Sequence, residues 1–334
     1  MLQRRVIIPP RLADLPTRLP AGEVLDVSGE AMGTYWTVKW VDEGVVSPES
    51  LTSRIEHVIA RVIDEMSTWQ EDAFISRFNS APANSDFALP ACFAHVLECA
   101  MQLAVDTGGA FDPTVGPLVN LWGFGPDRPI TQPPTQIDIA AAQTLCGWRR
   151  VVVTDGYICQ PGGLYLDFSG IAKGYSVDLI ADSLRGLGIH NFLVEVGGEL
   201  SGSGIKPNGQ PWWVALEAPE LQGQDQQSIV ALYGLAVATS GDYRRYFDHQ
   251  NIRYSHTLDP RTGYPVADAP FAVSVLHSSC MHADALATAL TVLGVQAGLE
   301  YAVHRHIAAI FTQMEAGKPV QYVSPAMLEM VEEV

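Results

Sequence analysis

Residues 283–290 read Ala-Asp-Ala-Leu-Ala-Thr-Ala-Leu, a small and apolar run that predicts a helix carrying one carboxylate and one hydroxyl. Residues four apart share one face of a helix, so Asp284 and Thr288 would present two oxygen atoms side by side. Such oxygens suit a hard cation like Mg²⁺, which keeps positions open for the phosphates of a substrate. A buried hydrogen bond that fixes the helix is the more ordinary explanation of the pair taken alone.

The composition is that of a globular chain with mixed α and β structure. The 334 residues can enclose a large core, either in one domain or in two closely joined ones. With 20 basic and 37 acidic residues, the formal net charge is −17. Because such a chain repels nucleic acid and anionic membranes, we expect no nucleic-acid partner. An anionic ligand would need a metal, a few placed cations or backbone N–H groups.

Three features bear on the compartment. The five cysteines show no CxxC pairing, which indicates reduced thiols. The start of the chain has two arginines but no continuous apolar segment, and no cysteine precedes Cys92. No apolar stretch looks long enough to cross a bilayer, so we expect no stable membrane insertion. These features favour the cytoplasm, or the periplasm if the N-terminus is incomplete.

The expected helices and strands are interleaved irregularly. Helices are expected at 48–66, 91–106 and 171–187, besides the one that carries Asp284. Strands are expected at 33–41, 150–154, 164–168, 192–196, 213–217, 230–238, 271–277 and 307–312. This order favours an α+β fold, with mixed, largely antiparallel sheets, packed helices and one compact unit of two lobes. We expect an N-terminal arm at 1–25, the main domain at 26–325 and a C-terminal tail at 326–334.

Two glycine-containing turns could receive a ligand. Residues 167–178 indicate a strand end, a tight turn and a helix start, with Lys173 just inside the helix. Backbone N–H groups at such a turn favour an anion, although the Walker spacing is missing and an ordinary turn explains the pattern as well. A strand also leads into Gly197 and Gly198, where a ligand could approach the backbone or a simple hairpin could turn.

Residues 256–263 place His256, Asp259, Arg261 and Thr262 around a Pro-Gly turn. The imidazole could act as a general base near neutral pH, although a single histidine in a turn is more often structural. Elsewhere, flat side chains such as Trp69 could face a planar ring system like a flavin, although core aromatics are the commoner explanation.

Seven separated motifs agree in order along the chain. They are 66–69, 111–117, 167–178, 196–199, 240–243, 256–263 and 283–290. Together they resemble the FAD:protein FMN transferase family, also called the ApbE family, from about residue 29 to about residue 312. The resemblance implies an enzyme that splits FAD with Mg²⁺, joins FMN through a phosphodiester bond to a Thr or Ser hydroxyl of an acceptor flavoprotein, and releases AMP.

The resemblance also implies roles for individual residues. Asp284 and Thr288 correspond to metal ligands, together with the main-chain carbonyl of Ala172. His256 corresponds to the base that deprotonates the acceptor hydroxyl, with Asp259 in the same catalytic loop and Lys173 near the pyrophosphate. The residues expected to bind FAD are Met32, Trp69, Asp112, Lys173, Glu195, Gly197, Gly198, Glu217 and Thr262.

The chain departs from its relatives in two ways. Relatives often carry Tyr where this chain has Trp69, and Trp can stack on a FAD ring without the hydroxyl. Many relatives are exported lipoproteins, whereas this sequence shows no export signal. Two other functions stay open: a FAD pyrophosphatase that yields FMN and AMP, and a FAD-binding protein without turnover.

Overall fold

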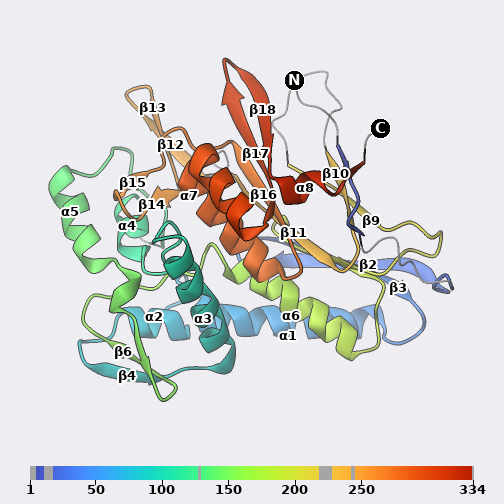
Figure 1. Ribbon diagram of the computed structural model, residues 1–334. Coiled ribbons are helices and arrows are strands. Elements are labelled where there is room, and N and C mark those ends of the chain that lie inside the picture. Colours follow the sequence, from blue (N-terminus) through green and yellow to red (C-terminus); the bar gives the residue numbers. More distant parts are fainter. Residues whose placement is uncertain (1–4, 11–17, 127–128, 218–227, 242–244, 333–334) are drawn as a thin grey trace.

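An eight-stranded antiparallel sheet forms the centre of the computed structural model, which describes residues 5–10, 18–126, 129–217, 228–241 and 245–332. The strand order is β18-β17-β16-β11-β8-β7-β3-β2. Figure 1 labels the strands of this sheet except β7 and β8. The bounds are β2 (Glu23–Ala31), β3 (Thr34–Asp42), β7 (Phe192–Val196), β8 (Glu199–Ser203), β11 (Leu235–Gly241), β16 (Ala272–His277), β17 (Ala308–Glu315) and β18 (Lys318–Val323). The expected antiparallel α+β class is thereby confirmed.

Three long helices pack on one face of this sheet: α1 (Pro48–Met66), α6 (Ala172–Gly186) and α7 (Cys280–Arg305). The sequence defines α1 sharply, because Ser47 caps its first turn, Pro48 occupies the first position and apolar residues recur at helical spacing. The buried stripe of α1 packs with one face of α6 against Trp36, Val38 and Trp40 of β3. These residues alternate along the strand, as expected for 33–41.

The helix α7 is the apolar centre of the molecule. It lies against β11 and β16 and crosses α6, so most of its first half is buried. Judged by length and composition alone, α7 is long and apolar enough to cross a bilayer, so the expectation that no such stretch exists was wrong. However, Gly294 has φ 74° and ψ 177° and interrupts the helix, so each half is shorter than the about 20 residues that span a membrane. Its apolar character is explained by burial in the core.

A second lobe is built from the segment between α1 and α6 (Figure 1). It contains α2 (Phe74–Asn79), α3 (Ala91–Asp106), α4 (Gly116–Leu121), α5 (Gln136–Leu145) and the sheet β4 (Ser85–Ala88), β6 (Tyr157–Gln160), β5 (Val152–Thr154). Side chains of α2 and α3 share one core cluster with α7, which joins the two lobes through continuous apolar packing. A short 3-10 helix, Trp148–Arg150, precedes β5.

The other face of the main sheet is covered by a smaller sheet. Its order is β19 (Val331–Glu332), β1 (Val6–Ile7), β10 (Ile229–Leu232), β9 (Trp212–Ala215), and β1 pairs with β10 in parallel. Ile7 of β1 and Met327 of α8 (Pro325–Leu328) are buried in the same cluster. The expected arm and tail thus each contribute a packed piece, and β2 begins at Glu23, before residue 26. The domain boundaries themselves stay a prediction.

Two strand expectations differ from the structure. Residues 164–168 are extended and carry buried apolar side chains, but they join no sheet. Side chains take the place of a neighbouring strand, because the Asn79 amide both donates to and accepts from the Leu166 backbone at 2.9 and 2.8 Å. The expected strand 230–238 is two strands, β10 and β11, in different sheets, which Gly234 separates with a φ of 67°.

Two short hairpins complete the described fold. They are β12 (Tyr246–His249) with β13 (Ile252–Ser255), and β14 (Leu258–Asp259) with β15 (Tyr264–Pro265). Phe247 and Tyr254 stack at 5.1 Å across the first hairpin and lie near Trp122 of the second lobe. The loop between the two hairpins, which contains His256, is thereby held against that lobe.

The crossing of α6 and α7 leaves no room for a side chain at Gly174. A Cβ there would lie 2.3 Å from the Cys280 carbonyl oxygen and 2.8 Å from Cβ of Asp284. We expect Gly174→Ala to lower the free energy of unfolding by about 1–3 kcal/mol, because neither neighbour can move without shifting a helix. Urea denaturation measures the change.

The matched control is Gly186→Ala, at the other end of the same helix. A Cβ at Gly186 would meet nothing within 4 Å, so the unfolding free energy should stay level or rise, since alanine favours a helix. Equal losses in both variants would show that the crossing is not tightly packed.

Candidate active site

A cavity of about 490 Å³ opens where one end of the main sheet meets α6 and α7. This volume falls within the about 300–1,000 Å³ common for small-molecule sites. The polar and charged residues that line the cavity come from both lobes and from the loop between the hairpins. They are Thr34, Asp112, Asp167, Ser169, Lys173, Glu199, Thr239, Ser240, Arg245, His256, Thr257, Asp284 and Thr288.

Two tight turns form the sheet side of the cavity. Met32 and Gly33 join β2 to β3 with φ values of 54° and 72°, and Gly197 and Gly198 join β7 to β8 with 63° and 101°. Two-residue hairpin turns need such positive φ values, which glycine adopts freely and methionine only rarely. A Cβ on Gly197 would lie 2.8 Å from a Thr34 methyl group. The glycine therefore lets the two turns approach each other at the cavity.

The pair Asp284 and Thr288 lies on α7 where this helix crosses α6. Asp284 is only 6% exposed, and its carboxylate accepts a 3.0 Å hydrogen bond from the Gly174 N–H of α6. Burial raises the pKa of Asp284, while Lys173 and the Gly174 N–H act in the opposite direction. Thr288, one turn further along α7, also lines the cavity. The predicted oxygen pair therefore faces one space, and the carboxylate bonds the other helix.

Lys173 is the second residue of α6 and forms an ion pair with Glu199, the first residue of β8. Glu199 is 2% exposed, so a carboxylate is held almost without water beside one cation. Among the residues that the structure describes, acidic side chains outnumber permanent cations in the cavity lining: these are Asp112, Asp167, Glu199 and Asp284 against Lys173 and Arg245.

The ion pair between Lys173 and Glu199 should contribute measurably to the free energy of unfolding. We expect Lys173→Ala to lower the unfolding free energy by about 3–5 kcal/mol, because it removes the cation that faces the buried Glu199 carboxylate. Adding Glu199→Gln to the same chain should restore part of the loss. Thermal unfolding of both variants checks this, with the exposed Lys39→Ala as the control expected to change little. If the second substitution deepens the loss instead, the pair is not the source of the effect.

His256 lies in the loop after β13 and reaches the cavity. Its backbone N–H donates to the Arg245 carbonyl at 3.0 Å, and its Nδ1 lies 3.2 Å from the same oxygen. A carbonyl can only accept, so this contact favours the tautomer that carries its proton on Nδ1. In that tautomer, Nε2 has the lone pair that a general base needs.

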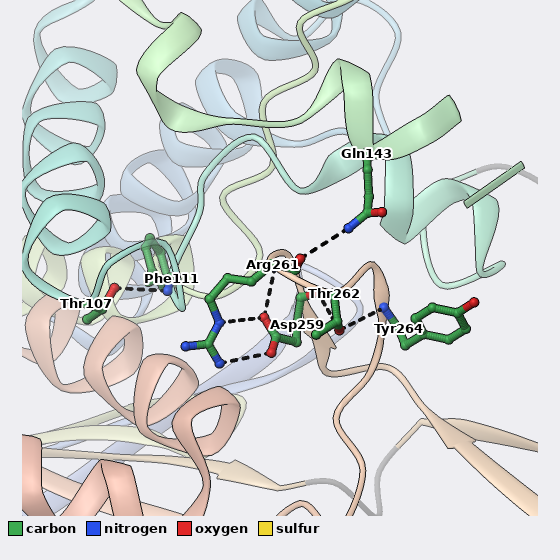
Figure 2. A network of polar contacts seen from close by, with 7 residues as sticks. All are labelled: Thr107, Phe111, Gln143, Asp259, Arg261, Thr262 and Tyr264. Carbon is green, nitrogen blue, oxygen red and sulfur yellow. Dashed lines mark hydrogen bonds and ion pairs between the residues drawn. The ribbon is translucent and has the colours of Figure 1, made fainter. Parts of the chain in front are cut away.

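Asp259 takes part in a network of its own loop (Figure 2). Its carboxylate accepts from Nε and Nη2 of Arg261 at 2.8 and 2.9 Å, and from the Arg261 backbone N–H at 2.9 Å. Gln143 of α5 donates to the Arg261 carbonyl, and Thr262 accepts from the Tyr264 N–H. Asp259 is not among the residues that line the cavity. These contacts indicate that it shapes the loop beside His256, and the catalytic role expected from the sequence stays a prediction.

Asp112 is held at the cavity by the second lobe. Its carboxylate accepts from the backbone N–H and hydroxyl of Thr114 at 2.8 and 2.6 Å, and from the Trp148 N–H at 3.2 Å. Burial raises the pKa of Asp112, although these donors oppose the shift. In its protonated form, which burial favours, this carboxyl group can donate a hydrogen bond to a ligand as well as accept one.

The structure brings together half of the residues predicted for the site. The cavity is lined by Met32, Asp112, Lys173, Gly197, His256, Asp284 and Thr288. The lining does not include Trp69, Ala172, Glu195, Gly198, Glu217, Asp259 or Thr262.

Several of these outer residues still lie close to the cavity in the chain or in space. Ala172 precedes Lys173 in the first turn of α6, and Gly198 follows Gly197. Trp69 is 61% exposed, with the Arg245 guanidinium 5.9 Å from its ring, so it stands at the rim. Glu217 follows β9, which belongs to the smaller sheet.

Sequence reasoning passed over Arg245, which lines the cavity, holds His256 through its carbonyl and donates from Nη2 to the Phe124 carbonyl at 3.0 Å. It also gave Glu199 no separate role. The charge of Glu199 directly after a double glycine was the available signal for that residue, and the nearby motif 240–243 was the signal for Arg245.

Within the described residues, no three His, Cys, Asp or Glu side chains gather as a closed metal site. A metal ion bound here would need backbone or hydroxyl oxygens as further ligands, together with oxygens of a bound substrate. Mg²⁺ commonly binds in this way, through one or two carboxylates and substrate phosphates.

Comparisons with known proteins agree over nearly the whole chain. A family model described as the ApbE family matches residues 32–311, which include every cavity residue named above. The protein named FAD:protein FMN transferase of Vibrio cholerae is 39% identical over 290 residues, covering 86% of this chain and 87% of its own. Its namesake in Haemophilus influenzae is 37% identical over 295 residues, covering 86% and 85%.

Solved structures agree in fold as well. The apo form of Pseudomonas stutzeri flavinyl transferase ApbE has a TM-score of 0.85 at 40% identity, covering 92% of this chain and 96% of its own. The flavin transferase ApbE from Vibrio cholerae also has a TM-score of 0.85, at 36% identity, covering 93% and 100%. The fold of those proteins therefore extends over both lobes and the cavity between them.

Proposed function

Because this chain belongs to the ApbE family and is a FAD:protein FMN transferase, we propose that it uses Mg²⁺ to join FMN to a Thr or Ser hydroxyl of an acceptor flavoprotein, releasing AMP. The observation that carries the proposal is the placement of Asp284 and Thr288 on the cavity face of α7, beside the first turn of α6. That turn supplies Lys173 and the carbonyl of Ala172.

The charge of the cavity fits a divalent cation. Four acidic side chains and two permanent cations line it within the described part of the chain, so the diphosphate of FAD would meet an excess of acidic groups there. A buried carboxylate whose pKa is raised, such as Asp284, is stabilised as an ion when a cation binds to it. Asp284, Thr288 and the Ala172 carbonyl would hold Mg²⁺, which neutralises charge on the phosphates when bound.

The chain's own residues can then perform the transfer. The acceptor hydroxyl oxygen forms a bond to the phosphorus of the FMN half, and the anhydride bond to AMP breaks. His256 accepts the hydroxyl proton at Nε2, while the Arg245 carbonyl holds its Nδ1–H. Lys173 and the N-terminus of α6 bind and orient the pyrophosphate oxygens. Trp69 at the rim offers a flat surface to a ring of FAD.

One assay tests the proposal. Purified protein is incubated with FAD, Mg²⁺ and a flavoprotein domain that offers a Thr or Ser, and the acceptor is weighed by mass spectrometry. We expect the acceptor to gain the mass of one FMN less water, to lose this gain in EDTA, and to lose it when its Thr or Ser is replaced by Ala. Release of FMN and AMP without labelling would instead identify a pyrophosphatase, and retention of intact FAD would identify a binding protein.

A further inference from the structure

We propose that Asp178 is a positioning residue for the metal site, because it fixes the register of α7 against α6. The inference rests on the proposed function, since it concerns the oxygens that would hold Mg²⁺. Asp178 does not line the cavity and touches none of the reacting groups. It would act through the helix that carries Asp284 and Thr288.

The Asp178 carboxylate caps the start of α7 from the neighbouring helix. It accepts from the N–H groups of Cys280 and Met281 at 2.8 and 3.0 Å, and from the Ser279 hydroxyl at 2.7 Å. The Ser279 hydroxyl in turn accepts from the His282 N–H at 3.3 Å. The first amides of α7 are therefore satisfied through one carboxylate of α6, which also opposes the positive end of the helix dipole.

The contact is reciprocal. Just as Asp178 of α6 binds the first turn of α7, Asp284 of α7 binds the Gly174 N–H in the first turn of α6. No side chain caps the α6 N-terminus locally, so Asp284 supplies the cap. Asp178 lies one turn beyond Gly174, and Asp284 one turn beyond Cys280, so each pair shares one helix face. The two carboxylates clamp the same crossing from opposite helices.

This clamp determines where the metal ligands meet. The proposed ligands come from both helices, with the Ala172 carbonyl on α6 and the Asp284 and Thr288 oxygens on α7. A slide or rotation of α7 along α6 would move the two groups of oxygens apart, and Mg²⁺ tolerates little departure from octahedral geometry. The close backbone contact at Gly174 prevents the two helices from coming closer together, but it does not prevent α7 from sliding along α6. Asp178 supplies that second restraint.

The test compares Asp178→Asn with Asp182→Asn, which lies one turn later on α6, is largely exposed and pairs with Arg185. Asparagine keeps the shape of the carboxylate but loses its charge and one acceptor oxygen. Two quantities are measured: equilibrium binding of Mn²⁺ in the presence of FAD without acceptor, and the Mg²⁺ concentration that half-saturates transfer. We expect both to weaken about tenfold or more in Asp178→Asn, as for residues that orient metal ligands, and to stay unchanged in Asp182→Asn.

The rate at saturating Mg²⁺ should stay within a few-fold of the wild type, because no reacting group is removed. If Asp178→Asn lowers only the melting temperature and leaves both metal measurements unchanged, Asp178 is purely structural and the proposal is overturned. If Asp178→Asn does not fold, Ser279→Ala, which removes one donor to Asp178, should weaken Mn²⁺ binding in the same direction to a smaller extent; unchanged binding would overturn the proposal.

Different results would contradict the positioning role of Asp178 and the proposed metal-dependent function. If the wild type binds Mn²⁺ in the presence of FAD and labels its acceptor, and Asp178→Asn has the same Mn²⁺ affinity and the same Mg²⁺ requirement, only the positioning role is wrong. When the wild type itself binds no Mn²⁺ in the presence of FAD, the proposed metal-dependent function is wrong, and the positioning role is wrong with it.

Discussion

Replacing Asp284 with alanine should reduce Mg²⁺-dependent labelling of an acceptor flavoprotein by at least about 1,000-fold. The variant loses the carboxylate that the cavity offers at the proposed metal site. A bound metal is worth several kcal/mol in a reaction of this kind, and each about 1.4 kcal/mol corresponds to a factor of ten in rate. Labelling is followed by mass spectrometry over a range of Mg²⁺ concentrations. Activity equal to that of the wild type would remove Asp284 from the metal site.

The isosteric Asp284→Asn separates this loss from a failure to fold. Burial raises the pKa of Asp284 in the folded state, so the native protein binds a proton there more readily than the unfolded chain. The metal-free wild type should therefore gain stability from this group as the pH falls through the raised pKa, until the unfolded carboxyl also protonates near about 3.9. Asparagine resembles the protonated form, so the melting temperature in EDTA at neutral pH should not fall. A large fall would show that the carboxylate is needed for folding.

Replacing His256 with alanine should slow FMN transfer by about 10²–10⁴-fold, the usual contribution of a positioned general base. Binding of FAD should change far less, because the side chain is proposed to act on the acceptor hydroxyl. Single-turnover labelling gives the rate, and quenching of FAD fluorescence gives the affinity. Since His57 is exposed on α1, His57→Ala is the matched control and should leave both values unchanged.

The pH profile of the labelling rate provides a second check on His256. A rate limited by a neutral imidazole falls on the acidic side as that imidazole is protonated, and this limb should disappear in His256→Ala. If the alanine variant loses FAD affinity and transfer rate by the same factor, His256 contributes to binding and not to proton removal.

Much of the fold could be predicted because capping residues and apolar spacing in the sequence mark the same helices and strands that bury their apolar faces in the structure. The bounds of α1 follow from Ser47, Pro48 and the apolar spacing, all of which are visible in the sequence. Residues 164–168 misled the prediction, since alternating buried side chains resemble a strand whether the backbone pairs with another strand or with Asn79. The separation of β10 from β11 depended on Gly234, which a continuous apolar run concealed.

The candidate site could be predicted as separate motifs but not as a geometry. The spacing of Asp284 and Thr288 placed them on one helix face, and the structure brings Lys173 and His256 to the same cavity. The sequence could not show that Asp284 bonds Gly174, because that contact depends on two helices crossing 110 residues apart. Conversely, Asp259 and Arg261 are only two residues apart in the sequence. An ion pair between them was therefore a simpler expectation for the Asp259 carboxylate than a catalytic role.

The excess of carboxylates in the cavity also bears on how FAD and the proposed Mg²⁺ would depend on each other. Free FAD would bring more negative charge to Glu199 and Asp284. Free Mg²⁺ would find three proposed protein ligands, which leave its other coordination positions to the phosphates of FAD and to water. Each ligand should thus bind well only in the company of the other, with a positive coupling free energy. Thermodynamic reciprocity requires that Mg²⁺ tightens FAD by the same factor as FAD tightens Mg²⁺. The enzyme would thereby act as a detector of the FAD–Mg²⁺ complex, and its saturation would follow the product of the two concentrations.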